Sequence, residues 1–395
     1  MKTMEMTKAT KKNLPAGWRW VKLGEVCRVF AGSAAPQGKD YFSSVGPFFF
    51  RVSDIGRFRR TMQLSESQDR LSPVALARCQ LVLARKGAVL FPKSGAAITT
   101  NNRALLDVDG YIVSHLMALE PTDAILAEWV YHATCRIDMM DFSDNTGYPS
   151  LKQSVVEKIQ IPLPPLAEQW RIAGVLREQM AAVEKARAAA QARLEAVKDL
   201  PAALVRETLR NGRKSRHLLG ECLLEVRNGV GVNWSKYPVL GATRDGLAPA
   251  KEPVGKTPER YKLADPVTVF YNPMRILLGS IAMVDEGDEP GITSPDYVVV
   301  KGRSGVLDTR WFNYWFRSTE GVHLIDSLSR GAVRERILFN RLAAGEIEIP
   351  DYKTQLHASS RMEQVKPIIE TITLELNTIN ALPAALLRRA FAGDL

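Results

Sequence analysis

The chain has 395 residues, of which 46% are apolar and 24% charged, and its formal net charge at pH 7 is +10. This composition excludes a largely disordered protein and leaves room for two or three domains. The sequence has no run of about 18 apolar residues, so we expect a cytoplasmic protein without a membrane-spanning helix. Most of the basic excess lies outside the helical segments described below, which favours globular parts that face a polyanion.

A first mixed α/β domain is predicted for residues 14–160, after a polar tail of residues 1–13. Short β-like runs alternate there with turns marked by glycine and proline. Residues 82–98 have the pattern of a β-hairpin with a basic turn. Residues 124–136 show helical spacing, with Trp129 on the apolar face, and we expect this helix to pack on the strands.

The central segment, residues 161–212, is predicted to be a long helix introduced by prolines. Proline suits the extended approach and also the first helical position, where its missing N–H has no partner to lose. From Leu166 on, apolar residues recur in alternating steps of three and four, as in a coiled-coil seam. Some 35 helical residues at about 1.5 Å each make a rod of roughly 50 Å. This length is typical of a spacer.

A diverged second copy of the same plan follows. Three landmarks recur in the same order: Leu23-Gly24-Glu25 and Leu219-Gly220-Glu221, the Ile-Pro pairs at 161 and 349, and Leu-Pro-Ala-Ala-Leu at 200 and 382. They indicate a tandem duplication of about 190 residues. We therefore predict a second mixed domain over residues 213–346 and a second long helix over 347–395.

Within the second copy, residues 267–282 match the predicted hairpin at 82–98, and residues 309–317 match the first packing helix with an aromatic-rich sequence that we assign to the core. In the second long helix, Ser360 and Glu363 have capping-box spacing, although Pro367 lies a turn later. The side chains predicted to face the partner helix are Ile172, Leu176, Val183 and Val197 in the first helix, and Met362, Val365, Ile369, Ile372, Leu376 and Ile379 in the second.

No motif for catalysis, a cofactor or a metal is recognised. The cysteines and histidines are scattered, and neither a glycine-rich dinucleotide loop nor a P-loop occurs. Asn272-Pro273-Met274-Arg275 lacks the second proline and the aromatic residue of an amino-methyltransferase turn. Pro295-Asp296 with Lys301 lacks a nuclease carboxylate, because Val299 stands in its place. We therefore predict a protein that recognises another molecule and does not catalyse a reaction, with no metal site.

The sequence IPLPPLAEQ at residues 161–169, followed by Arg171-Ile172 and the long helix, resembles the hallmark of specificity subunits of Type I restriction-modification systems. LGEV at 23–26, the segment from Gly147-Tyr148-Pro149 to Ile159, and GAVLFPKSGAAI at 87–98 are also similar to that family. The resemblance extends over the whole chain. The second helix departs from the pattern, because residues 351–355 read DYKTQ where PPLAEQ would stand.

The resemblance implies an α+β fold with two tandem mixed α/β target-recognition domains separated by two long antiparallel coiled-coil helices. Each domain would read one half of a bipartite, asymmetric site in double-stranded DNA, and the helices would set the gap. Two methyltransferase (modification) subunits would dock on the helices and methylate adenine with S-adenosylmethionine, and restriction subunits would add translocation and cleavage with ATP and Mg. This chain would then be non-catalytic and hold no cofactor.

Candidate DNA contacts follow from side-chain chemistry, because arginine suits guanine and asparagine suits adenine. In the first domain the candidates are Arg57, Arg59, Arg60, Lys93, Ser94, Asn101, Asn102 and Arg103. In the second they are Arg244, Lys251, Lys256, Asn272, Arg275, Arg330 and Arg334.

Two alternatives stay open. One is a non-catalytic coiled-coil scaffold that binds only proteins, and the other is a specificity subunit of a methylation-only or related defence system. A self-sufficient restriction or modification enzyme would need a cofactor loop or a nuclease triad, and neither is recognised in this sequence.

Overall fold

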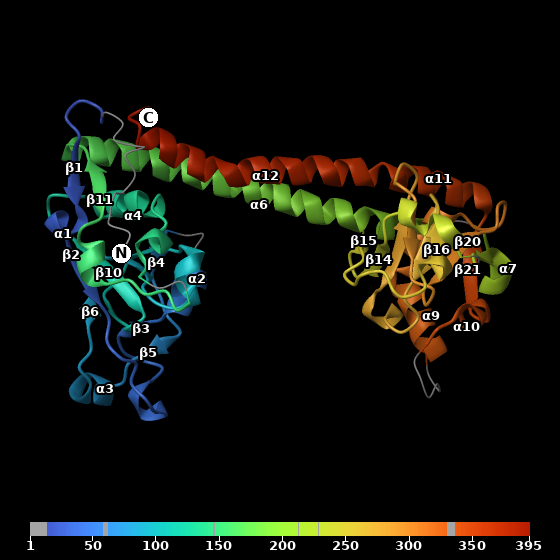
Figure 1. The fold of residues 1–395 in the computed structure, drawn as a ribbon, viewed down its shortest axis with the longest axis horizontal. Coiled ribbons are helices and arrows are strands. Elements are labelled where there is room, and N and C mark those ends of the chain that lie inside the picture. The colour runs from blue at the N-terminus through green and yellow to red at the C-terminus, as the bar shows by residue number, and fades with distance from the viewer. Residues whose placement is uncertain (1–13, 58–61, 145–146, 212, 228, 330–335) are drawn as a thin grey trace. The chain divides into compact units, whose positions relative to one another are not determined.

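The computed structural model describes residues 14–57, 62–144, 147–211, 213–227, 229–329 and 336–395. The chain forms two compact units, residues 1–187 with 378–395, and residues 188–377. Each unit combines a mixed α/β body with part of the long helix α6 (Leu166–Asn211) and part of α12 (Val365–Ala390) (Figure 1). The predicted α+β fold, with tandem mixed domains and two long helices, is confirmed.

The first unit is built on two sheets. The five-stranded sheet has the order β2 (Cys27–Ala31), β10 (Leu116–Pro121), β7 (Val89–Pro92), β8 (Ala104–Leu106), β4 (Gln63–Leu64). The four-stranded sheet has the order β5 (Asp69–Arg70), β3 (Phe48–Phe50), β9 (Gly110–Ile112), β6 (Leu83–Ala84). Its other elements are β1 (Arg19–Lys22), β11 (Gln160–Leu163), α1 (Leu23–Val26), α2 (Val52–Arg57), α3 (Pro73–Arg78), α4 (Ala127–Cys135), α5 (Gln153–Val156), η1 (Lys39–Tyr41), η2 (Ala96–Thr100) and η3 (Met139–Phe142).

Strand β7 is buried on both faces, which explains its unbroken apolar sequence. Successive side chains of a strand point to opposite faces of the sheet. Val89 and Phe91 therefore join the core beneath α4, whereas Leu90 joins the core between the two sheets. The five-stranded sheet is thus the central layer of the first unit.

The predicted hairpin at residues 82–98 is wrong. Strand β6 pairs with β9 and strand β7 pairs with β8 and β10, so the two strands belong to different sheets. Gly87 between them has φ +89, a left-handed conformation that glycine adopts without strain, and residues 96–100 form η2 instead of a returning strand.

The second unit contains smaller sheets. A four-stranded sheet has the order β13 (Leu223–Glu225), β20 (Val298–Gly302), β17 (Thr268–Tyr271), β18 (Ile281–Val284). Two pairs lie beside it, β14 (Leu240–Thr243) with β15 (Gly246–Pro249), and β16 (Lys262–Ala264) with β19 (Gly291–Thr293). The remaining elements are β12 (Lys214–Leu218), β21 (Glu346–Pro350), α7 (Leu219–Cys222), α8 (Thr309–Phe316), α9 (Thr319–Ser329), α10 (Phe339–Ala343), α11 (Tyr352–Glu363), η4 (Gly231–Lys236), η5 (Pro258–Arg260) and η6 (Ile276–Leu278).

Two predictions for this unit are confirmed. Strands β17 and β18 form an antiparallel hairpin, as predicted for residues 267–282. Helix α8 begins at its cap Asp308, whose side chain accepts the N–H of Trp311 at 2.8 Å, and its aromatic side chains are core. Those fully or nearly fully buried are Trp311, Phe312, Trp315 and Phe316.

The internal repeat is visible in atomic detail. Strand β1 pairs with β11, and its counterpart β12 pairs with β21. A Cβ added at Gly24 would lie 3.0 Å from Cβ of Glu157, and one at Gly220 would lie 3.0 Å from Cβ of Ala343. Both Leu-Gly-Glu segments therefore need glycine because another chain segment packs against them.

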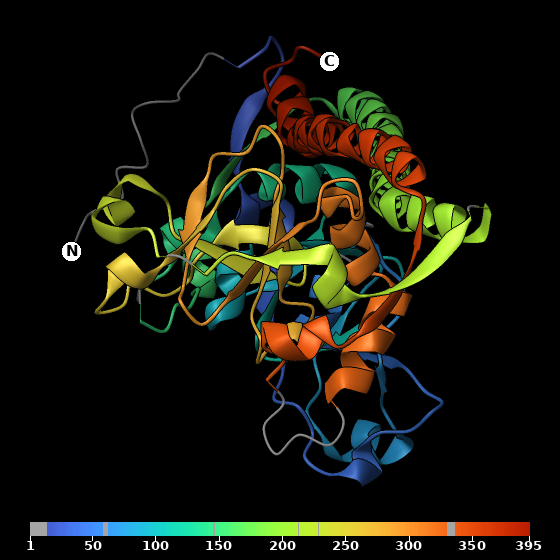
Figure 2. The ribbon, with the colours of Figure 1, turned by 90° about the vertical axis from the view of Figure 1, so that its right-hand side faces the viewer.

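The two long helices are antiparallel within each unit and lie side by side (Figure 2). In the first unit, Nη2 of Arg171 near the start of α6 donates to the carbonyl of Leu395 at 2.5 Å. In the second, Arg361 of α11 and Glu207 near the end of α6 form an ion pair at 3.5 Å. None of the helices in the described residues is both long and apolar enough to cross a membrane.

The start of the second long helix differs from the capping-box prediction. Ser360 lies inside α11, and the true N-cap is Asp351, whose carboxylate accepts the N–H of Thr354 at 3.0 Å. Helix α12 begins at Val365, so Pro367 lies in its first turn, where proline removes no intrahelical hydrogen bond.

Most side chains predicted to face the partner helix are buried. Val197 and Ile369 are half-buried. The others are buried, namely Ile172, Leu176, Val183, Met362, Val365, Ile372, Leu376 and Ile379.

Candidate nucleic-acid interface

In the first unit, Arg57 is exposed at the C-terminal end of α2. The carboxylate of Asp54 anchors this helix by accepting the backbone N–H of Arg51 at 2.7 Å and the hydroxyl of Ser67 at 2.9 Å. A Cβ added at Gly56 would lie 4.0 Å from Nδ2 of Asn102. The structure thus brings the end of α2 beside Asn102. The other two arginines predicted here, at 59 and 60, lie outside the described residues.

The side chains of Asn101 and Arg103 make hydrogen bonds within the first unit. Asn101 is in the left-handed region, with φ 50, and its Nδ2 donates to the carbonyl of Ile137 at 3.0 Å. Arg103 is 3% exposed, donates to Oδ1 of Asn101 at 2.9 Å, and lies 5.0 Å over the ring of Phe91. Burial lowers the pKa of Arg103 to about 10, which leaves it charged at neutral pH. Its DNA contact stays a prediction, and the geometry indicates that it positions the Asn101–Asn102 turn.

Lys93 and Ser94 form a half-buried turn after β7. The N–H of Lys93 donates to the carbonyl of His115 at 2.8 Å, and Oγ of Ser94 lies 2.6 Å from Nδ1 of His115. A Cβ added at Gly95 would lie 3.6 Å from the hydroxyl oxygen of Tyr148, which is exposed. Tyr148 therefore joins this surface, although the sequence indicated only a turn at that position.

In the second unit, Arg244 lies beside the turn of the β17–β18 hairpin. Arg244 is exposed in the turn between β14 and β15, and a Cβ added at Gly279 would lie 3.4 Å from its Cγ. Oδ1 of Asn272 accepts the N–H of Met274 at 3.0 Å, which shapes the turn that carries the exposed Arg275. The fold therefore brings Arg244, Asn272 and Arg275 to one edge, and Leu278 in the turn between β17 and β18 is exposed.

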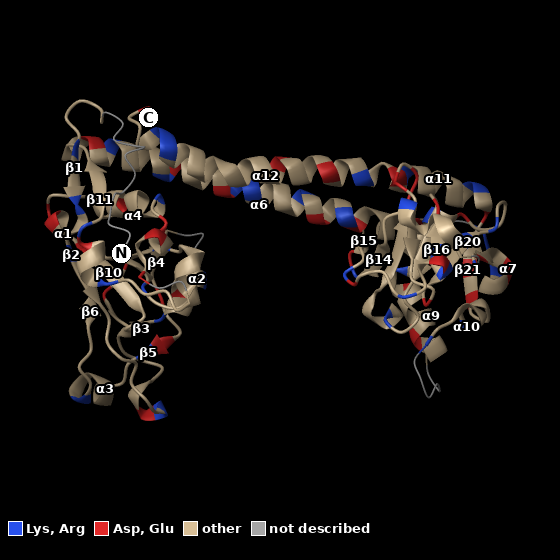
Figure 3. Ribbon diagram, in the orientation of Figure 1, with Lys and Arg blue, Asp and Glu red and all other residues tan. Residues whose placement is uncertain are grey.

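In the part of the chain that it describes, the structure does not bring the other cations predicted in this unit to the edge formed by Arg244, Asn272 and Arg275. Lys251 and Lys256 are exposed in the segment between β15 and η5. The arginines at 330 and 334 lie outside the described residues. Lysine and arginine occur on loops of both units, with acidic residues among them (Figure 3).

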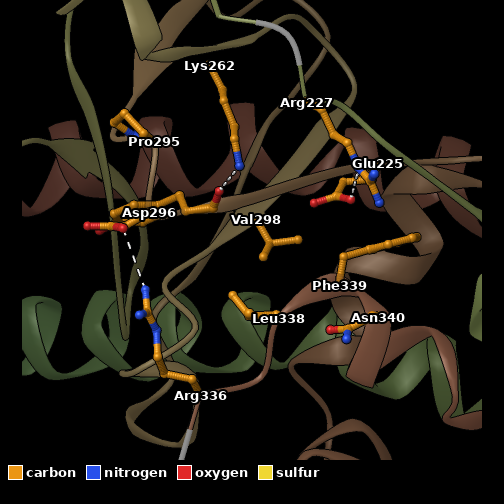
Figure 4. Close-up of a pocket in the computed structure, with 11 residues that line it drawn as sticks. Glu225, Arg227, Lys262, Pro295, Asp296, Val298, Arg336, Leu338, Phe339 and Asn340 are labelled. Carbon is orange, nitrogen blue, oxygen red and sulfur yellow. Dashed lines mark hydrogen bonds and ion pairs between the residues drawn. The ribbon is translucent and has the colours of Figure 1, made fainter. Parts of the chain in front are cut away.

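A polar pocket of about 430 Å³ lies in the second unit, between β13, β16, the start of β20 and the start of α10 (Figure 4). Nε of Arg227 donates to Glu225 at 2.5 Å, Nζ of Lys262 donates to the carbonyl of Tyr297 at 2.6 Å, and Arg336 lies 3.5 Å from Asp296. Burial lowers the pKa of Lys262. Guanidinium, carboxylate and amide groups of this kind can hydrogen-bond the edges of bases.

Sequence reasoning missed these pocket residues, because they come from segments far apart in the chain. In the sequence, Asp296 stands out only through the incomplete nuclease motif that it forms with Lys301. Among the described residues, no group of three or more His, Cys, Asp or Glu side chains could hold a metal ion. The two arginines of the pocket pair with carboxylates and Lys262 donates to a backbone carbonyl, so the pocket is suited to hydrogen bonding.

A buried glutamine joins each body to the helix that follows it, which is α6 in the first unit and α11, directly before α12, in the second. Gln169 is 1% exposed, and its Oε1 accepts the N–H of Leu126, the cap of α4, at 2.8 Å, while its Nε2 donates to the carbonyl of Pro164 at 2.9 Å. Gln355 is fully buried, and its Oε1 accepts the N–H of Asp308, the cap of α8, at 2.8 Å. Its Nε2 donates to the carbonyl of Pro350, also at 2.8 Å.

A tryptophan completes each of these joints. Nε1 of Trp129 donates to the carbonyl of Pro162 at 2.8 Å, and its ring stacks on Phe391, just beyond α12, at 4.4 Å. Nε1 of Trp311 donates to Oγ1 of Thr208 near the end of α6 at 3.0 Å. We call the Gln169–Trp129 and Gln355–Trp311 arrangements the helix seats. Each of them contacts one helix start and one helix end.

Comparison with known proteins adds a family. A family model described as the Type I restriction modification DNA specificity domain matches residues 15–190. The Type I restriction enzyme MjaIX specificity subunit of Methanocaldococcus jannaschii is 27% identical over 39% of this chain and 35% of its own length. The StySPI specificity subunit of Salmonella potsdam is 25% identical over 70% of this chain and 67% of its own length. The chain thus spans about a third and two thirds of these relatives.

Two solved structures have a similar fold. The HsdS subunit from Thermoanaerobacter tengcongensis gives a TM-score of 0.56 at 20% identity, over 97% of this chain and 98% of that one. A chain from a structure of complex assembly and conformational transition of the type I R-M system gives 0.66 at 20% identity, over 97% and 99%. At this identity the likeness concerns the fold.

Proposed function

We propose that the chain is a specificity subunit of a Type I restriction-modification system, as its similarity to that family supports, and that it reads a two-part, asymmetric site in double-stranded DNA, one half with each unit. The chain contributes recognition and no catalysis. S-adenosylmethionine, ATP and Mg belong to the partner subunits.

The observation that carries the proposal is a repeat with a shared frame and different surfaces. Both units keep the same closing strands, Leu-Gly-Glu segment and helix seat. The first unit then presents Arg57, Asn102 and the Lys93–Ser94 turn, whereas the second presents the Arg244–Arg275 edge and the polar pocket. Side chains at base edges specify sequence, so unlike surfaces on one frame suit unlike half-sites.

The helices are proposed to set the gap between the half-sites. Helix α6 is continuous over 46 residues, which corresponds to about 69 Å. Dimeric DNA readers place equivalent elements about one helical turn, roughly 34 Å, apart on B-DNA. A helix of this length is therefore ample for a spacer of one turn or more.

Two methyltransferase subunits, and restriction subunits where the system has them, are proposed to dock on the helices. The helix starts keep apolar side chains at the surface, since Leu166 and Trp170 are exposed one turn apart on α6 and Leu356 is exposed on α11. Exposed apolar residues at rigid elements are typical of protein interfaces.

Methylation mapping tests this function. The chain is co-expressed with the neighbouring methyltransferase gene in cells that lack other adenine methylation, and the DNA is sequenced by a method that detects modified adenine. We expect a two-part site with a fixed gap that disappears without this chain. Folded, associated proteins that yield no such pattern would favour the protein-only scaffold. A two-part pattern in a genome without a restriction gene would favour the methylation-only system.

A further inference from the structure

The helix seats support an inference that rests on the proposed function and deepens it. We propose that Gln169 and Gln355 are positioning residues: each fixes the orientation of its recognition body on the long helix, and together they set how strictly the complex measures the gap between half-sites.

The directionality of the bonds is the first argument. A primary amide has an acceptor end and a donor end in one plane. Gln169 uses the acceptor end on the cap of α4 and the donor end on the carbonyl of Pro164, directly before α6. Apolar packing alone is non-directional and permits small rotations. Because the amide is buried, water cannot replace either bond, and rotation would leave polar groups unpaired.

The second argument is that the two seats share these bonds while their surroundings differ. Helix α4 has the sequence AEWVYHATC and helix α8 has TRWFNYWF. Trp129 bonds a backbone carbonyl, whereas Trp311 bonds the hydroxyl of Thr208. The glutamine bonds are kept in both. They therefore belong to the joint and are not a by-product of one packing pattern.

The two helix seats differ in the number of hydrogen bonds that their glutamine makes. Nε2 of Gln355 donates to a second carbonyl, that of Val306, at 3.0 Å, in addition to the carbonyl of Pro350. Gln169 has one acceptor for its Nε2 in the described residues. Loss of Gln355 thus removes three bonds, and loss of Gln169 removes two.

A small rotation at a seat matters for DNA because the recognition body acts as a lever. A rotation of about 10° displaces a loop some 20 Å away by roughly 3.5 Å, which is close to the rise of one base pair. Half-site preference depends on side chains within one body and does not change with this rotation. The expected signature is therefore relaxed spacing with unchanged half-site sequences.

The test uses the assembled methyltransferase complex with Gln169→Met and Gln355→Met, which keep the side-chain length and remove the amide. Gln191→Met is the matched control, since Gln191 is exposed on α6 and bonds Glu195 of the same helix. Each complex methylates a DNA library in which both half-sites are separated by the native gap or by one base pair more or less.

We expect wild type and Gln191→Met to confine methylation to the native gap. Gln169→Met should lose about tenfold of this discrimination, which is equivalent to 1.4 kcal/mol, and Gln355→Met should lose more. Base preferences within each half should stay the same. Gln169→Glu retains an oxygen for the N–H of Leu126, but it places a buried carboxylate oxygen against the carbonyl of Pro164 where Nε2 donates in wild type, so a loss at least as large as that of Gln169→Met is expected.

Strict spacing in both methionine variants would overturn the inference. So would a uniform fall in methylation at every gap, because that is the result of simple destabilisation. If Gln169→Met does not assemble, Gln355→Met decides by the same criteria. A wild-type complex without any two-part pattern would instead contradict the proposed function, so the two failures are distinguishable.

Discussion

Gln169 and Gln355 make the same pair of hydrogen bonds, to a helix cap and to a prolyl carbonyl, near the starts of α6 and of α11, the helix that precedes α12. Only Gln169 lies in an IPLPPLAEQ sequence. The second helix, which departs from this pattern at residues 351–355, nevertheless supplies the equivalent glutamine, with Asp351 as its helix cap. The motif therefore diverged in sequence while the joint remained.

Trp129 is expected to stabilise the first unit through its helix seat. Trp129→Ala removes a fully buried ring, its stacking on Phe391 and its bond to Pro162. We expect the free energy of unfolding of this unit to fall by about 3–5 kcal/mol. Native-state hydrogen exchange of β10 amides measures this for one unit alone. Trp170→Ala, at an exposed position of α6, should change it by less than about 0.5 kcal/mol.

The free energy of unfolding of the first unit is expected to decrease as the pH is lowered, because of His132. Its Nε2 is buried without a hydrogen-bond partner in the described residues, and burial, aided by the charge of Arg177, lowers its pKa from 6.5 to about 4. Below pH 6.5 the unfolded chain binds a proton that the folded unit refuses. The loss therefore begins near pH 6.5 and approaches about 3 kcal/mol at pH 4.

The pH effect is measured by comparing urea unfolding of wild type and His132→Phe at pH 7 and pH 4.5. Other titrating groups act in both proteins, so the difference between them isolates His132. The variant should lose less stability on acidification than wild type. Equal losses would show that His132 gains a proton in the folded unit.

Substitutions of Arg103 and Arg275 are expected to have different effects, the first on stability and the second on DNA binding. Arg103→Met should destabilise the first unit by about 1–3 kcal/mol, because the three hydrogen bonds of the buried guanidinium are lost. Arg275→Ala should leave the free energy of unfolding within about 0.5 kcal/mol, weaken DNA binding and reduce the salt slope by about one. Thermal unfolding and DNA titrations at several salt concentrations separate the two. Unchanged DNA binding by Arg275→Ala would favour the scaffold alternative.

Local patterns in the sequence were sufficient for the repeat and the long helices. The paired Leu-Gly-Glu segments and the seam spacing depend on contiguous residues, and Trp311 and Phe312 were assigned correctly to the core. Strand pairing depends on partners distant in the chain, so the hairpin predicted at 82–98 was wrong although its β content was right.

The candidate site was harder to predict for the same reason. Arg103 is of a residue type that often contacts DNA. Only the fold shows that its guanidinium lies over the ring of Phe91 and donates to the carbonyl of Ile137. Arg227, Lys262 and Arg336 meet in one pocket from three separate segments, and no spacing in the sequence marks them. Side-chain chemistry identified plausible residue types, whereas accessibility required the structure.

The proposal that the helices measure the gap predicts the effect of changing their length. Arg193 of α6 and Glu375 of α12 form an ion pair across the helices. Deletion of one heptad around each preserves the seam and shortens both helices by about 10 Å, on the order of three base pairs. Methylation mapping should then give a shorter gap with both half-sites unchanged. Deleting the heptad from α6 alone should abolish methylation, because the seam and the seats can no longer both be satisfied. A double deletion that methylates the original gap would contradict the ruler, and it would leave recognition by the two units intact.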